Sequence, residues 1–247
     1  MKTLLQHRLF ISQNRDTAGA LSLALLFFPF TILVLGMDSE LFAVPIDMGR
    51  MLASLMSFGF FILLFKSADT RLRKLMFVMV LLSYIGELLF CKVLGMYYYR
   101  NEAIPLYVPF GHAIVYASGY ILSEMQWANN SKHLKTAFAI GFALLFVVTG
   151  LLLNDVLTLI FGLLFFVLVR RKRWQPLYYW IAICVIFIEL TGTWLRCWTW
   201  KPETLGFIPT ANPPMGAVFI YAGGDVLLDK IVRLWDIRKL KPQTPTI

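Results

Sequence analysis

Two acidic residues that lie inside apolar stretches are the strongest candidates for chemistry in this chain. They are Glu87 and Glu189. An acidic side chain in a membrane span costs about 2.5–3.5 kcal/mol on insertion scales, so such a residue is first interpreted as functional. Each is followed by two aromatic residues that are separated by one position. These aromatic pairs are Tyr97 with Tyr99 and Trp198 with Trp200.

This combination predicts acid catalysis on an unsaturated, lipid-soluble substrate. Burial disfavours the charged carboxylate, so a buried carboxyl can hold a proton near neutral pH. Such an acid can protonate a carbon–carbon double bond, and neighbouring aromatic faces stabilise the cation that forms. Hydration, cyclisation and double-bond isomerisation of isoprenoids all begin in this way. The predicted catalytic residues are Glu189, Glu87 and His112. The predicted substrate-binding residues are Trp198, Trp200, Tyr97, Tyr99, Trp194, Asn212, Tyr116, Tyr221 and Arg196.

The two acidic residues belong to an internal repeat. One copy runs from Glu87 to Tyr120 and the other from Glu189 to Asp225, and both end in the pattern P-x-G-x-x-x-x-Y-x-x-G. Its members are Pro109, Gly111, Tyr116 and Gly119 in the first copy, and Pro214, Gly216, Tyr221 and Gly224 in the second. Several residue types recur in order, so the two copies are expected to form equivalent structures.

Composition places these residues in a polytopic, all-α membrane protein. The chain of 247 residues is 59% hydrophobic and 15% charged, with a mean hydropathy of +0.70, and a soluble domain could not cover its surface with so few polar groups. A membrane-spanning helix needs about 20 mostly apolar residues. The eight predicted spans are 19–36, 48–65, 75–95, 107–122, 136–153, 155–169, 177–195 and 214–231.

The charged residues between these spans predict an orientation. The formal charge of +9 does not indicate a nucleic-acid partner, because the basic residues gather in alternate connections, as the positive-inside rule describes. The alternation places both termini in the cytoplasm, with the protein in a cell membrane, and we expect the bacterial inner membrane. The stretch 1–16 is then a cytoplasmic lead-in that is not cleaved.

Residues 1–130 and 131–247 then form two four-helix halves in parallel orientation. In this orientation both acidic residues lie in the outer half of the bilayer, beneath the aromatic segments. Pro105, Pro109 and Pro209 predict irregular backbone there, which is tolerated at membrane depth only inside protein or along a cavity. We therefore expect one pocket on the outer side, shared by the two halves.

Other interpretations of these residues remain open. The two acids can pair with Lys92 and Arg196 and serve helix packing alone, and the aromatic pairs can form an interfacial belt. His112 has no counterpart in the second copy, where Ala217 stands. It can form a hydrogen bond between helices or act as a second acid or base. Asp225, next to two glycines, is expected at a close helix contact.

Metal, cofactor and disulfide chemistry have little support in the sequence. The three histidines are scattered, without the clusters of membrane di-iron enzymes, so neither a metal nor a cofactor is predicted. Cys91 and Cys197 each follow a repeat acid and can form a disulfide, although free thiols are the simpler expectation. The expected partner is a membrane lipid or a lipid-soluble substrate. The oligomeric state is not determined by the sequence.

The two repeat copies resemble the carotenoid-biosynthesis membrane proteins of the bisanhydrobacterioruberin-hydratase type. The resemblance lies in GELLFCKVLGMYYYRNEAIPLYVPFGHA and ELTGTWLRCWTWKPETLGFIPTANPPMGA. The matching residues are Glu87, Tyr97, Tyr99 and Pro109 in the first segment, and Trp198, Trp200, Gly206, Pro209 and Asn212 in the second. The resemblance implies an enzyme of polyene or isoprenoid lipids. The pairing of Glu with Trp is also similar to the chemistry of sterol isomerases of the emopamil-binding class.

Two other functional classes compete with an enzyme. Parallel repeats and buried carboxyl groups also occur in transporters of lipids or small molecules, and a non-enzymatic subunit of an envelope complex fits the composition as well. The shape of the pocket separates these classes. A closed pocket that opens sideways to lipid favours the enzyme, whereas a path to both faces favours transport.

Overall fold

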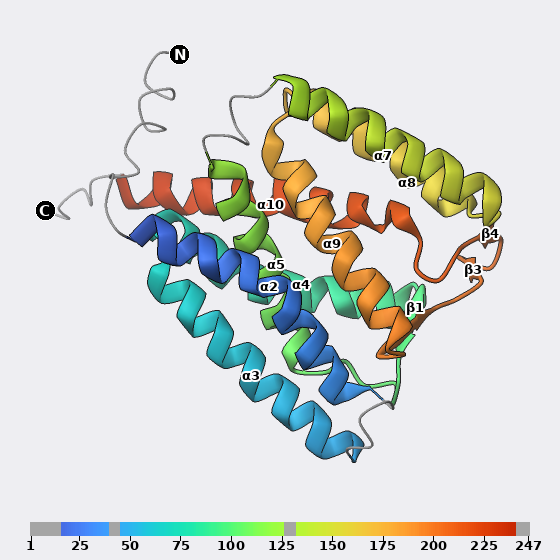
Figure 1. The fold of residues 1–247 in the computed structure, drawn as a ribbon, viewed down its shortest axis with the longest axis horizontal. Coiled ribbons are helices and arrows are strands. Elements are labelled where there is room, and N and C mark those ends of the chain that lie inside the picture. The colour runs from blue at the N-terminus through green and yellow to red at the C-terminus, as the bar shows by residue number, and fades with distance from the viewer. Residues whose placement is uncertain (1–15, 40–44, 126–131, 241–247) are drawn as a thin grey trace, which may run out of the picture.

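The computed structural model describes residues 16–39, 45–125 and 132–240, which are almost entirely helical (Figure 1). Residues 1–15 of the predicted N-terminal lead-in lie outside these ranges, and so does the predicted boundary between the two halves at residue 130. The helices are α2 (Asp16–Asp38), α3 (Ile46–Ser67), α4 (Thr70–Glu87), α5 (Tyr107–Glu124), α7 (Lys132–Leu152), α8 (Val156–Arg171), α9 (Pro176–Trp194) and α10 (Val218–Leu240). A π-helical segment η2 (Leu88–Val93) and a 3-10 turn η3 (Met215–Ala217) complete them. The predicted all-α class is confirmed.

Local sequence explains where several of these helices begin. The Asp69 side chain accepts a hydrogen bond from the backbone N–H of Leu72 (2.7 Å) and caps α4, which therefore begins before the predicted residue 75. Asp155 caps α8 in the same way through Thr158 N–H (2.9 Å). Asn154 has φ +51°, a conformation that Asn tolerates. The tight turn predicted between the fifth and sixth spans is thus present.

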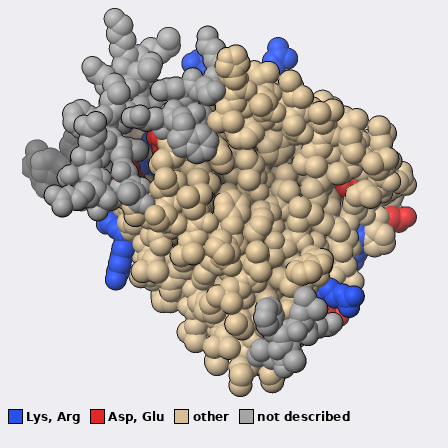
Figure 2. Space-filling view, in the orientation of Figure 1, with Lys and Arg blue, Asp and Glu red and all other residues tan. Residues whose placement is uncertain are grey.

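The helical surface is that of a membrane-integral protein. Within the described residues, five helical segments are long and apolar enough to cross a bilayer: Gly19–Asp38, Ile46–Ser67, Thr70–Val93, His133–Leu152 and Pro176–Trp194. Large apolar side chains such as Leu55, Ile85 and Leu163 are more than 60% exposed, which in water would be unfavourable over a wide area. Figure 2 shows a broad face almost free of charged side chains, with Lys, Arg, Asp and Glu at its edges.

Four helices surround the centre of the molecule. Helix α4 contacts α5, α5 contacts α9, α9 contacts α10, and α10 returns to α4. Helices α2 and α3 pack on α5, whereas α7 and α8 pack together and α8 packs on α10. In Figure 1, α3 and the α7–α8 pair accordingly lie at opposite edges of the bundle. The four central helices are the ones that flank the two aromatic segments.

The aromatic segments pair with one another as short strands. Strand β1 (Tyr97–Tyr99) runs antiparallel to β2 (Trp198–Trp200), with Tyr97 opposite Trp200 and Tyr99 opposite Trp198. The sequence did not predict this ladder, because a three-residue strand has no periodicity of its own and its partner lies in the other half of the chain. A second ladder joins β3 (Glu203–Thr204) to β4 (Ile208–Pro209). Figure 1 shows these strands at one end of the bundle.

The last helix is longer than the sequence predicted. The expected span ended at residue 231 with a basic tail beyond it, whereas α10 continues to Leu240. The ion pair of Lys74 with Asp236 holds this extension on α4, and the pair of Arg71 with Asp229 (2.9 Å) lies just before it. Asp229 also pairs with Arg233 one turn further along α10 (3.0 Å). Charged residues that were interpreted as a tail thus continue the helix through contacts with a partner distant in sequence.

Candidate functional site

Glu87, the last residue of α4, lies within a cluster of hydrogen bonds. Its Oε2 atom accepts hydrogen bonds from the hydroxyl groups of Tyr97 (2.9 Å) and Tyr99 (2.8 Å). Its Oε1 atom lies 3.0 Å from Nε2 of His112 on α5. Directly after Glu87 the helix widens into the π-helical segment η2, a form that often marks functional sites. Glu87 is only 4% exposed. Its buried carboxyl group is therefore held by three side chains and not by solvent.

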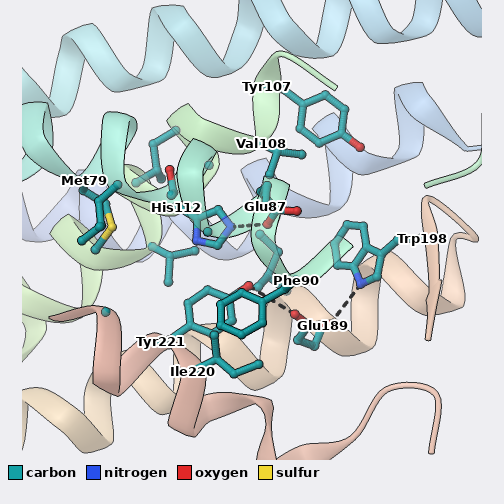
Figure 3. A pocket seen from close by; sticks show the side chains of 18 of the residues that line it. Met79, Glu87, Phe90, Tyr107, Val108, His112, Glu189, Trp198, Ile220 and Tyr221 are labelled. Carbon is teal, nitrogen blue, oxygen red and sulfur yellow. Dashed lines mark hydrogen bonds and ion pairs between the residues drawn. The ribbon is translucent and has the colours of Figure 1, made fainter. Parts of the chain in front are cut away.

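Glu189, on α9, has the same arrangement with different partners. Its Oε2 atom accepts hydrogen bonds from Nε1 of Trp198 (3.0 Å) and Nε1 of Trp200 (3.0 Å). Its Oε1 atom lies 3.2 Å from the hydroxyl group of Tyr221 on α10. Each acid thus binds the aromatic pair of its own copy through Oε2, and a residue of the following helix through Oε1. Figure 3 shows the two acids facing the same space.

The partners of the two Oε1 atoms are in contact with each other. The ring of His112 stacks on the ring of Tyr221, with centroids 5.0 Å apart and planes at 14°. Tyr221 belongs to the repeated pattern, where its counterpart is Tyr116, yet the residue that performs its role in the first copy is His112, one turn earlier in α5. Two acids from distant parts of the chain are therefore joined through one stacked pair (Figure 3).

The donor chemistry of the aromatic strands decides where a proton can reside on Glu189. An indole N–H donates and cannot accept, so Oε2 of Glu189, which faces two indoles, must be an acceptor. A proton held by Glu189 therefore lies on Oε1, where the Tyr221 hydroxyl oxygen can accept it. The partners of Glu189 thus suit a neutral carboxyl group, whereas Glu87 lies beside His112, a side chain that can carry a positive charge.

The tyrosines of β1 are held as hydrogen-bond donors. Burial, and next the nearby charge of Glu87, raises the pKa of Tyr97 and of Tyr99 well above the usual value of a phenol. Both hydroxyl groups therefore keep their protons and donate them to Glu87. Ring contacts join the strands across the ladder, from Tyr97 to Trp200 (centroids 4.8 Å apart) and from Tyr99 to Trp198 (6.2 Å).

Both acids line a cavity of about 490 Å³, a size typical of small-molecule sites. Its wall is mostly apolar and is built mainly from α2, α4, α5, α8, α9 and α10, with the two aromatic strands. Besides the acids, their aromatic partners and His112, the wall includes Phe27, Phe30, Met79, Leu82, Phe90, Tyr107, Phe161 and Phe219. Ile85, Leu89 and Leu227 also line the cavity, and these apolar side chains are 63%, 44% and 46% exposed. The cavity thus reaches the apolar helix surface between α4 and α10.

Glycines shape both the wall and the seat of Trp198. Gly192, one turn after Glu189 on α9, packs directly against the Trp198 ring. A Cβ atom at this position would lie 1.9 Å from Cη2 of the indole. Gly223 and Gly224 face the cavity, and a Cβ atom at either would meet nothing within 4 Å. Glycine therefore positions one ring and leaves open space beside the acids.

Four of the predicted site residues do not line the cavity. Trp194 is 72% exposed and Arg196 is exposed on the turn after α9. Asn212 is exposed and its Oδ1 accepts a hydrogen bond from the backbone N–H of Trp200 (3.0 Å), so it orders β2. Tyr116 is buried behind the cavity, between α5 and α10.

The alternative ion pair for Glu87 does not occur: Lys92 bonds the backbone oxygen of Glu102, and the described partners of Glu87 are aromatic residues and His112. Cys91, Cys184 and Cys197 are free thiols.

Sequence reasoning missed a second polar cluster beside the cavity. Tyr107, which lines the wall, donates a hydrogen bond to Oδ2 of Asp38 (2.7 Å), and Arg50 binds Oδ1 of the same carboxylate (3.0 Å). The predicted span 19–36 left Asp38 in the connection that follows, but it ends α2 and is fully buried. Among the described residues, no group of three or more His, Cys, Asp or Glu side chains is placed to hold a metal ion.

Comparisons with models of protein families, with curated proteins and with solved structures find no match to this chain. The geometry of the site therefore carries the functional argument.

Proposed function

We propose that this protein is an integral-membrane enzyme that acts by acid catalysis on a lipidic, unsaturated substrate of the isoprenoid or polyene class. The observation that carries the proposal is the shared cavity. Two buried carboxyl groups face one apolar space, each with Oε2 bound by aromatic donors and Oε1 turned toward the His112–Tyr221 stack. Hydration, cyclisation and isomerisation of a double bond all need an acid and a base placed in this way.

The partners of each acid indicate its role. Glu189 has donor-only indoles on one oxygen and an acceptor-capable hydroxyl on the other, so it holds the proton that adds to the double bond. The cation that forms lies beside the rings of Trp198 and Trp200, which stabilise positive charge. Glu87, paired with His112, stays ionised and removes a proton from the cation or from an attacking water molecule. Two like carboxyls in one apolar cavity favour this division, because both cannot be charged at low cost.

The wall of the cavity supports a lipidic substrate. Its titratable side chains are the two acids, His112 and tyrosines, and the rest are mostly aliphatic or aromatic. Exposed apolar residues at the α4–α10 side give a route from the bilayer, so a hydrocarbon chain can enter without crossing water. A charged or strongly polar substrate would find few partners along this route.

We further propose that the two copies are equivalent halves in parallel orientation, with eight transmembrane spans. The pairing of β1 with β2 supports this. In the repeat, Tyr97 corresponds to Trp198 and Tyr99 to Trp200. In the ladder the partners are exchanged, so that Tyr97 lies opposite Trp200 and Tyr99 opposite Trp198. A local two-fold axis through the central pair, Tyr98 and Thr199, produces this register. In this proposed arrangement the protein lies in the bacterial inner membrane. The strands are on the outer side, and the basic α3–α4 connection is on the cytoplasmic side.

A transporter of lipids or small molecules is the second candidate, and the same two-fold relation favours it, because paired halves around a buried site can alternate their access. The two candidates differ in what happens to the substrate. An enzyme changes its covalent structure, whereas a transporter returns it unchanged on the other side.

The test is the lipid profile of cells that produce the protein with both acids replaced, Glu189→Gln and Glu87→Gln. Lipids are extracted and resolved by chromatography with mass spectrometry. We expect one hydrophobic species to accumulate in the variant and its product to disappear; the product differs by the mass of water, or has the same mass and a different retention. Glu203→Gln is the matched control, since this Glu is exposed on strand β3, and it keeps the wild-type profile.

A second variant tests the cavity without touching the acids. Gly224→Leu fills open space, because a Cβ atom at Gly224 meets nothing within 4 Å. We expect it to abolish the same product, whereas Gly141→Leu, at an exposed helical site away from the cavity, leaves it unchanged. An unchanged lipid profile in the double acid variant would contradict the enzyme proposal.

A further inference from the structure

We propose that Asp225 delivers protons to Glu189 along one face of α10. The proposal rests on the proposed function, in which Glu189 loses a proton to the substrate in each reaction cycle. Where the acid and the base are different residues, the acid must regain its proton before the next cycle. A buried acid behind apolar walls needs a route for that proton.

A row of polar side chains supplies such a route. Tyr221, Asp225 and Asp229 follow one another at four-residue spacing on α10, so they lie on one face, about 6 Å apart along the axis per step. Tyr221 lies at one end, 3.2 Å from Oε1 of Glu189. Asp229 lies at the other end, partly exposed and paired with Arg71. Asp225 is the step between the site and the solvent-facing end.

One carboxyl oxygen of Asp225 is buried without a hydrogen bond to any described residue. Its side chain is 3% exposed, and its Oδ2 atom has no hydrogen-bond partner. Buried polar atoms are nearly always bonded, and an exception calls for an explanation such as an internal water molecule or a functional role. Asp225 does not line the cavity, so substrate contact does not explain it. A role in which this carboxyl group takes up and releases a proton explains the unbonded oxygen.

The groups that face Asp225 continue the polar path. Tyr116 of α5 and Tyr178 of α9 interact electrostatically with both Asp225 and Asp229. Their hydroxyl groups can donate and accept hydrogen bonds. Tyr116 also feels the charge of Arg71, and Tyr178 that of Arg233. Three helices thus direct polar side chains toward the segment that a proton must cross, and single water molecules can bridge the remaining gaps.

The transfer is balanced at each oxygen. The protonated carboxyl of Asp225 gives its proton, directly or through a water molecule, to the hydroxyl oxygen of Tyr221. The hydroxyl group of Tyr221 gives its own proton to Oε1 of Glu189, which becomes neutral. Asp225 remains as a carboxylate and regains a proton from solution past Asp229. One proton moves inward, and Tyr221 ends as it began.

A path to Glu189 from the opposite side, past the aromatic strands, cannot pass a proton to its carboxyl group. On that side Glu189 meets the indoles of Trp198 and Trp200, which can donate a hydrogen bond but cannot accept a proton. Oε1 is the oxygen that carries the proton, and it faces Tyr221. The route along α10 reaches this atom through Tyr221.

Hydrogen–deuterium exchange of the Glu189 carboxyl tests the route. The purified protein in lipid vesicles is moved from H₂O to D₂O buffer, and the infrared C=O stretch of protonated carboxyl groups is followed with time. The band that disappears in Glu189→Gln belongs to Glu189. We expect Asp225→Asn to slow its exchange at least tenfold. Asn matches a protonated Asp in shape, and the Oδ2 atom that its amide nitrogen replaces has no hydrogen-bond partner, so the fold is kept.

Two further variants complete the experiment. Tyr221→Phe interrupts the route one step nearer to Glu189 and is expected to slow exchange as well. Asp236→Asn makes the same change as Asp225→Asn on the same helix, but at a partly exposed residue paired with Lys74, and it leaves the rate unchanged. A Glu189 band whose exchange in Asp225→Asn stays within twofold of wild type overturns the relay. If Glu189→Gln removes no band, Glu189 holds no proton, and the proposed function fails first.

Discussion

Gly192→Ala tests the placement of Trp198, on which the hydrogen bonding of Glu189 depends. The added Cβ atom would lie 1.9 Å from Cη2 of the indole, whereas ordinary contacts begin at 3.4 Å. The ring must therefore shift by about 1.5 Å, the difference between these two distances. Such a shift carries Nε1 away from the 3.0 Å hydrogen bond to Glu189.

The expected loss of stability follows from three contributions. Overpacking costs about 1–3 kcal/mol, and a buried donor left without its partner costs about 1–3 kcal/mol more. Replacing Gly by Ala within a helix returns about 1 kcal/mol. The free energy of unfolding of Gly192→Ala should thus fall by about 1–5 kcal/mol. For a chain of this size, the midpoint temperature falls by about 2–20 °C.

The assay is thermal unfolding in detergent, followed by tryptophan fluorescence. Gly59→Ala is the control, since Gly59 is an exposed helical residue whose added Cβ atom meets nothing within 4 Å. It should leave the midpoint unchanged or raise it. In a Trp198→Leu background, Gly192→Ala should lose its penalty, because the clashing ring is gone. Equal midpoints for Gly192→Ala and Gly59→Ala, both with Trp198 present, would refute the reasoning.

Substitutions at three other positions test the site and its supports by unfolding measurements of the same kind. Glu189→Gln should change stability by less than about 1 kcal/mol, because its amide oxygen accepts hydrogen bonds from both indoles. Glu189→Ala should cost about 2 kcal/mol or more, because it leaves those two donors unpaired. Equal losses of stability in the two variants would contradict a neutral Glu189. Gly119→Ala should cost about 1–3 kcal/mol, since its Cβ atom would lie 2.9 Å from the Cα atom of Ile181, and a neutral result would contradict the close contact of α5 with α9. Tyr99→Phe should cost about 1.5–3 kcal/mol against an exposed control, Tyr98→Phe. Burial raises the pKa of Tyr99, so the stability that its hydroxyl gives is complete below about pH 10 and declines above it; a penalty that grows with alkaline pH would contradict the assignment.

The sequence alone determined the class of the protein and the identity of its principal residues. Apolar runs of membrane-spanning length need no partner to be recognised, because the backbone must satisfy its own hydrogen bonds in a bilayer and a helix does so locally. A helix is found in each of the eight predicted ranges, and five segments meet the criteria for a membrane span. Glu87 and Glu189 stood out because acids in such runs are costly, and the repeat linked each to its aromatic pair.

The tertiary structure alone decided how these residues meet. That Tyr97 lies opposite Trp200 depends on contacts between residues far apart in the chain, and no local pattern specifies them. The partnership of His112 with Tyr221 could not be read from the repeat, which aligned His112 with Ala217 and Tyr221 with Tyr116. Short-range patterns fix what each segment can form, whereas the packing of four helices decides which oxygen of each acid faces which partner. That choice, made by long-range contacts, determines where a proton can lie.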